Sequence, residues 1–132
     1  MRSKSLPSNF PPELTVAAFV AGDEVAWPQA LATDAVEWFG KNEYAVLGTE
    51  LWVLKGGAIH SLPTGLSGTG EVHGNTVNRF SREAWGAFVG RAAAETRMYL
   101  REFNPRDIIE DGQVYFNVVW VSEGEFKSLS PI

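Results

Sequence analysis

The chain has 132 residues, of which 45% are hydrophobic and 20% are charged, and it carries no cysteine. This length and composition predict one globular domain over residues 1–132 and argue against extended disorder. The missing cysteine excludes disulfides, thiolate zinc sites and a cysteine nucleophile. The net charge of −5 disfavours nucleic acid as a partner; it suits a basic partner, although it is also an ordinary charge for solubility.

Two helices are predicted in the first third of the chain. Residues 1–10 form a loose lead-in, and the prolines at 11 and 12 start a short helix that we expect to end at Gly22. A second helix is predicted from Pro28 to Gly40, because apolar residues recur there at spacings of three and four and glycine is a favoured C-cap. Residues 23–27 between them form a connector or a short strand.

The stretch from 42 to 59 predicts the centre of the sheet. Two apolar runs, Tyr44–Leu47 and Leu51–Leu54, are separated by Gly48-Thr49-Glu50, which is either a bulge or bend in one long strand or a very tight turn. The Gly56-Gly57 pair predicts a hairpin turn that pairs Leu51–Leu54 with Ala58–Leu62.

The rest of the chain adds a long loop, a long helix and a strand. Residues 63–78 are rich in glycine and predict a loop. Ser81 is the expected N-cap of a helix that runs to Phe103, and Val114–Val121 is an apolar strand followed by a polar turn and a tail. The predicted fold class is α+β, with a small, mainly antiparallel sheet of three to four strands packed against about three helices.

No catalytic or cofactor pattern is convincing. The glycines from Gly68 to Gly74 do not have the spacing or the strand-loop-helix order of a phosphate-binding loop. The histidines, His60 and His73, lie in or beside this loop with Glu71 close by, and flexible chain does not fix their geometry. We therefore expect no enzyme activity, metal or cofactor; a small enzyme or ligand-binding domain that uses this loop is the alternative.

Acidic residues supply the candidate binding sites. Asp107, Glu110 and Asp111 follow the long helix, where a solvated turn is favoured over a cation site. Asp23 and Glu24 form a second acidic patch. Glu50 lies between two apolar segments, so its carboxylate must either reach solvent or find a partner such as an arginine. We predict these six residues as candidates for contact with a partner.

Three segments resemble one bacterial family. They are Glu24–Leu31 (EVAWPQAL), Ala45–Trp52 (AVLGTELW) and Trp85–Phe103 (WGAFVGRAAAETRMYLREF). They are similar to predicted immunity proteins of polymorphic-toxin systems, the family known as immunity protein 40, in a tryptophan near a helix start, an aliphatic-Leu-Gly strand and a later helix that begins at a tryptophan. The family strand continues with a second glycine and an aspartate, which Thr49 and Glu50 replace here, and the chain also has a glycine-rich insertion before the long helix.

The resemblance implies a cytoplasmic, non-enzymatic protein that neutralises a cognate bacterial toxin by binding it. Another protein-interaction or structural domain is the alternative, and self-association is left open. We expect no nucleic-acid partner and no membrane segment, since no apolar run approaches the roughly 18 residues that a span needs. The prolines at 11 and 12 and Glu13 interrupt the N-terminal stretch where a secretion signal would lie, which favours the cytoplasm.

Overall fold

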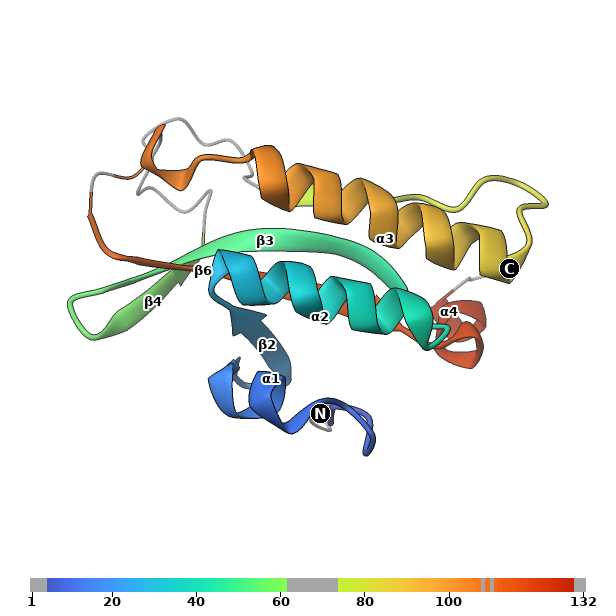
Figure 1. The fold of residues 1–132 in the computed structure, drawn as a ribbon, viewed down its shortest axis with the longest axis horizontal. Coiled ribbons are helices and arrows are strands. Elements are labelled where there is room, and N and C mark those ends of the chain that lie inside the picture. The colour runs from blue at the N-terminus through green and yellow to red at the C-terminus, as the bar shows by residue number, and fades with distance from the viewer. Residues whose placement is uncertain (1–4, 62–73, 108, 110, 130–132) are drawn as a thin grey trace.

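The computed structural model describes residues 5–61, 74–107, 109 and 111–129, and Figure 1 shows its α+β architecture. The helices are α1 (Pro12–Ala17), α2 (Gln29–Lys41), α3 (Trp85–Glu102) and α4 (Glu123–Leu129), with one 3-10 turn, η1 (Pro105–Asp107). The strands are β1 (Phe19–Ala21), β2 (Glu24–Trp27), β3 (Ala45–Lys55), β4 (Ala58–Ser61), β5 (Gly74–Thr76) and β6 (Gln113–Val121). The predicted α+β class with an antiparallel sheet is therefore confirmed, whereas the described residues form four α-helices rather than about three and more strands than predicted.

Over the described residues, the sheet is antiparallel and has six strands, in the order β1-β2-β6-β3-β4, with β5 also paired to β3. The predicted count of three to four strands is too small. Residues 19–21, assigned to the first helix, form β1 instead, because α1 ends at Ala17 and the chain turns through Gly22 at a φ of +64° to pair with β2. Part of the predicted loop, Gly74–Thr76, is β5.

The long strand β3 resolves the ambiguity around Gly48. It is one strand that pairs with β6 along nearly all its length, with a bulge between Val46 and Gly48. A Cβ at Gly48 would collide with the Asn75 carbonyl of β5, so glycine is required for these strands to approach. The predicted hairpin at residues 56–57 is also present, and it pairs Leu54 with Ile59.

The helices α2 and α3 lie alongside each other over one face of the sheet (Figure 1). Gly40 is not the C-cap that we expected, because α2 continues to Lys41 and Asn42 caps it through a side-chain bond of 2.8 Å to the Trp38 carbonyl. A Cβ at Gly40 would come within 2.7 Å of the Ala93 Cβ on α3. This glycine therefore serves helix-helix contact rather than helix termination.

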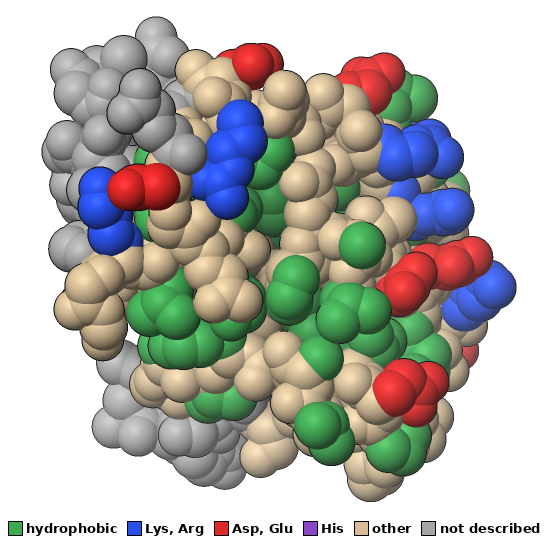
Figure 2. Space-filling view, turned by 60° about the vertical axis from the view of Figure 1, so that its left-hand side comes forward, with side chains coloured by type: hydrophobic (Ala, Val, Ile, Leu, Met, Phe, Trp, Pro, Cys, Tyr) green, Lys and Arg blue, Asp and Glu red, His purple; other side chains and the backbone are tan. Residues whose placement is uncertain are grey.

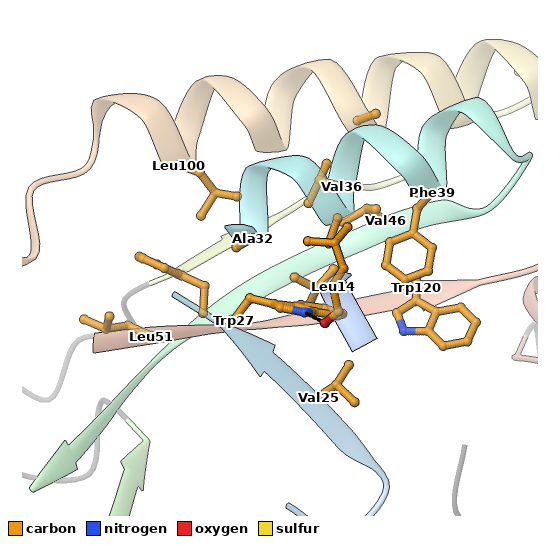
Figure 3. Packing of buried hydrophobic residues seen from close by; sticks show 14 of the residues in the cluster. Leu14, Val25, Trp27, Ala32, Val36, Phe39, Val46, Leu51, Leu100 and Trp120 are labelled. Atoms are coloured by element: carbon orange, nitrogen blue, oxygen red, sulfur yellow. Dashed lines mark hydrogen bonds between the residues drawn. The ribbon is translucent and has the colours of Figure 1, made fainter. Parts of the chain in front are cut away.

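The core lies between α2 and the sheet. Figure 3 shows Trp27, Val36, Phe39 and Trp120 within it, and the rings of Phe39 and Trp120 stack with centroids 4.9 Å apart. The Trp27 side chain is fully buried, and its indole N–H donates to the Leu14 carbonyl at 2.7 Å, which attaches α1 to the same core.

Two helix ends differ from the prediction. Ser81 is not the N-cap of α3, which begins at Trp85, because the Glu83 carboxylate accepts the Phe80 amide at 3.0 Å and closes a turn before the helix. Residues 123–129 of the predicted C-terminal turn and tail form α4 instead. Its start is a capping box, in which the Glu125 amide donates to the Ser122 hydroxyl and the Ser122 amide donates to the Glu125 carboxylate.

Candidate functional site: the acidic open face of the sheet

The sheet has a second face, turned away from α2, which we call the open face, although Ala26, Trp52 and Asn117 on it are buried. Residues directly opposite in antiparallel strands share a face, and the core residues Val53, Leu51 and Phe116 are on the side of α2. The residues that alternate with them define the open face across β1, β2, β6, β3 and β4: Phe19, Ala21, Glu24, Ala26, Glu50, Trp52, Leu54, Ile59, Tyr115 and Asn117.

Three of the predicted acidic residues meet on this face. Asp23 is in the β1–β2 turn, Glu24 starts β2, and Glu50 is in the middle of β3. All three line one hollow of about 400 Å³, together with Ala21, Trp52 and Ile59. The sheet brings them together because β6 is the shared neighbour of β2 and β3: Asn117 is opposite both Ala26 and Glu50.

Glu50 has a neutral partner rather than the arginine that we considered. The indole N–H of Trp52 donates to the Glu50 carboxylate at 2.9 Å. The side chain of Trp52 is only 4% exposed, although it belongs to the open face. The bond therefore fixes the direction of the carboxylate without cancelling its negative charge.

The charges of these residues repel one another. The pKa of Glu24 is raised by partial burial of its carboxyl, by the nearby charge of Glu50 and by that of Asp23. Among the residues that the structure describes, no ion pair joins any of these three acids to a lysine or an arginine. The hollow therefore holds negative charge that the described part of the fold does not neutralise.

Aromatic and amide groups complete the open face. The rings of Phe19 and Tyr115 meet with centroids 5.3 Å apart, which joins the edge strand β1 to β6. Asn117 is 4% exposed and donates from its side-chain nitrogen to the Val25 carbonyl at 2.9 Å. Sequence reasoning missed both Trp52 and Asn117, although a lone asparagine in an apolar strand was a usable signal.

The second predicted acidic patch lies elsewhere. Asp111 forms an exposed ion pair of 3.0 Å with Lys55, at the turn end of β3, and Asp107 is exposed in η1 beside Asn104. Neither residue lines the hollow. Glu110 lies outside the described residues, so the three carboxylates are not shown as one cluster.

The alternative site in the glycine-rich loop also lies outside the described chain. Residues 62–73 include Glu71 and His73, and of His60 only the backbone is described, paired with Val53. The described residues contain no group of three or more histidine and acidic side chains arranged to hold a metal ion. Among the helices described, none has both the length and the apolar composition that crossing a membrane requires.

Glu83 and Tyr99 also have shifted pKa values, and both lie in packing contacts outside the hollow. Glu83 binds Arg91 at 2.8 Å, and this bond lowers the pKa of Glu83 to about 2. Burial raises the pKa of Tyr99 to about 12, and its ring stacks on Phe103. Figure 2 shows the molecule turned so that the left-hand side of Figure 1 comes forward; acidic and basic side chains are intermixed toward its margin, and apolar groups gather lower down. Among the described residues, the acids of the hollow have no lysine or arginine as an ion-pair partner.

Comparison with known proteins does not assign the chain to a family. The chain matches no family model, and no curated protein and no solved structure is significantly similar to it.

Proposed function

We propose that this protein is a non-enzymatic, acidic binding protein that acts as an immunity protein and neutralises a cognate bacterial toxin by direct contact. The observation that carries the proposal is the convergence of Asp23, Glu24 and Glu50 on one hollow of the open face, without an ion-pair partner among the described residues. The resemblance of three segments to predicted immunity proteins supports the assignment of the partner as a toxin.

The proposal follows from the energetics of unpaired charge. Carboxylates that repel one another reduce the stability of the free protein, and a partner that brings lysine or arginine removes that repulsion. Complementary charge also steers two proteins together, so that the association rate rises at low salt. An acidic hollow beside the aromatic rings of Phe19 and Tyr115 offers such a partner both charge and apolar contact.

Co-expression with the toxin encoded next to it tests the function. Cells that produce the toxin should grow only when the protein is present, and the two proteins should copurify. Absence of both rescue and complex would contradict the toxin assignment. If the protein instead copurifies with a different protein, it is an interaction domain of another kind.

Matched variants test the surface. The double variant E24Q/E50Q removes two negative charges from the hollow, and we expect the association rate with the toxin to fall by roughly tenfold at low salt. D111N removes one charge outside the hollow and should leave the rate within about twofold. Equal effects of the two variants in a stopped-flow or surface-binding assay would show that the hollow is not the contact.

A further inference from the structure

The strand β1 forms one edge of the sheet. It pairs with β2 on one side and, among the described residues, has no strand on its other side. Val20 at its centre is 63% exposed, so solvent reaches the strand there. A strand without a neighbour presents unpaired backbone N–H and C=O groups to whatever approaches. The outer edge of β1 is therefore a place where another extended chain can pair.

The β1–β2 turn shows which backbone groups of β1 point outward. Ala21 and Glu24 close a two-residue turn, and such a closing pair exchanges both of its backbone bonds. Because bonded pairs alternate along antiparallel strands, Val20 and Val25 form a non-bonded pair and direct their backbone groups away from each other. The groups of Val25 point to β6, and those of Val20 point outward. Among the described residues, Val20 makes no backbone bond outside its strand pairing.

The acidic hollow adjoins this edge. Ala21 of β1 lines the hollow together with Asp23, Glu24 and Glu50. A residue opposite Ala21 on an added strand would share the face of Ala21, as Glu24 does on the other side. The backbone of that residue would be two strand spacings from Glu24, roughly 10 Å, which a lysine or arginine and a glutamate side chain span together. Since Ala21 has only a methyl group, it leaves this path open.

We propose that an extended segment of a protein partner pairs in the antiparallel direction with the outer edge of β1 and places a lysine or arginine opposite Ala21. This inference rests on the proposed binding function and deepens it by naming the binding mode. The residue opposite Val20 exchanges two backbone bonds with it, which give affinity, and the side chains on the open face give specificity. A second copy of this chain is disfavoured as the occupant, because each copy carries a net charge of −5.

The first experiment measures amide hydrogen exchange by NMR in the free protein. The protection factor of the Val20 amide should be at least about tenfold lower than those of Phe19 and Ala21, whose amides bond β2. Protection of Val20 equal to that of its two neighbours would overturn the proposal, because the Val20 amide would then not be the free donor of this edge.

The second experiment titrates a seven-residue peptide of alternating lysine and valine to millimolar concentration. Saturable shifts of the Val20 amide signal, with slowed exchange, are the expected result, and a glutamate-valine peptide should not bind. With its lysines on the open face, the valine amides of the peptide bond β1 and its lysine amides point away. N-methylation of the valine amides should therefore weaken binding about tenfold, and N-methylation of the lysine amides less than about twofold. No shift at Val20, or equal or reversed effects of the two methylations, would overturn strand addition.

Variants of the protein test the same contacts. Val20→Pro removes the outward N–H, and proline is accepted on an edge strand where the N–H faces solvent, so the fold should persist and peptide binding should be lost. Ala21→Leu obstructs the path to Glu24 and should weaken the lysine-valine peptide by about threefold or more, whereas D111N should not. Binding by a folded Val20→Pro, or a dimer of the natural chain that this variant abolishes, would overturn the proposal. The methylated peptides decide independently of how this variant folds.

The outcomes for the function and for the binding mode can be told apart. Growth rescue by Val20→Pro equal to that by the natural chain would leave toxin binding standing and overturn strand addition. Saturable peptide binding at Val20 without growth rescue by the natural chain would support strand addition and overturn the assignment of a toxin as the partner.

Discussion

Replacement of Asn117 by alanine tests the physical link between the fold and the candidate site. Asn117 is 4% exposed, and its side-chain nitrogen donates to the Val25 carbonyl at 2.9 Å. The alanine variant removes this side-chain donor from the Val25 carbonyl. Loss of one partner of a buried hydrogen bond costs about 1–3 kcal/mol. We therefore expect Asn117→Ala to lower the free energy of unfolding by about 2 kcal/mol.

The expected change in melting temperature follows from the size of the chain. An unfolding entropy of about 2.1 cal/mol/K per residue gives roughly 0.28 kcal/mol/K for 132 residues. A loss of about 2 kcal/mol then corresponds to a fall of roughly 7 °C in Tm. Urea denaturation followed by tryptophan fluorescence, together with calorimetry, measures both quantities.

Two further variants decide whether the reasoning holds. Asn117→Asp also lacks the donor, and it places another carboxylate beside Glu24 and Glu50, so it should destabilise more than alanine at pH 7. Gln113→Ala removes an exposed amide from the same strand and should change stability by less than about 0.5 kcal/mol. A loss in Asn117→Ala no larger than in Gln113→Ala would refute the role assigned to this bond.

Three other predictions concern stability. Gly74→Ala should cost about 1–3 kcal/mol in urea unfolding, because a Cβ there would collide with the Thr49 carbonyl on the neighbouring strand. Arg91 lowers the folded-state pKa of Glu83 to about 2. The stability that this pair contributes is therefore present above the unfolded-state pKa, near 4.3, and is lost as the pH falls toward 2. Glu83→Gln should abolish this pH dependence of stability in an acid titration. The folded-state pKa of Glu24 is raised instead, so ionisation of Glu24 lowers the stability of the folded protein as the pH rises through that pKa. Glu24→Gln should therefore raise stability at pH 7 by a few tenths of a kcal/mol, and this gain should vanish near pH 3.

Local signals predicted the long elements of the fold. The apolar periodicity of α2 and α3, the glycine pair before β4 and the apolar run of β6 each act over a few residues. Short strands were missed, because β1 and β5 have three residues each and their pairing with β2 and β3 stabilises them more than their own composition does. The capping box at Ser122 was also missed, but unlike the short strands it could have been predicted, because its Ser-x-x-Glu spacing is visible in the sequence.

The three acids of the hollow were each predicted as candidate contact residues, but their position in one hollow was not predicted. Nothing in the sequence places Glu50 beside Asp23 and Glu24, because their proximity depends on β6 entering between β2 and β3 late in the chain. The same local reasoning grouped Asp107 with Asp111 from their spacing, yet Asp111 instead pairs with Lys55 at the end of β3. Cross-strand register therefore decides which acids form a site, and spacing along the chain does not.

The partner of Glu50 bears directly on function. An arginine beside this carboxylate would have neutralised its charge within the fold and left little to attract a basic protein. The indole N–H of Trp52 is a neutral donor, so it orients the carboxylate at 2.9 Å while the negative charge remains. Partial burial is the largest cause of the raised pKa of Glu24, and the nearby charge of Glu50 adds to it. The carboxylate of Glu50 therefore has a fixed direction and no cationic partner among the described residues, and the proposed contact with a basic partner would use both properties.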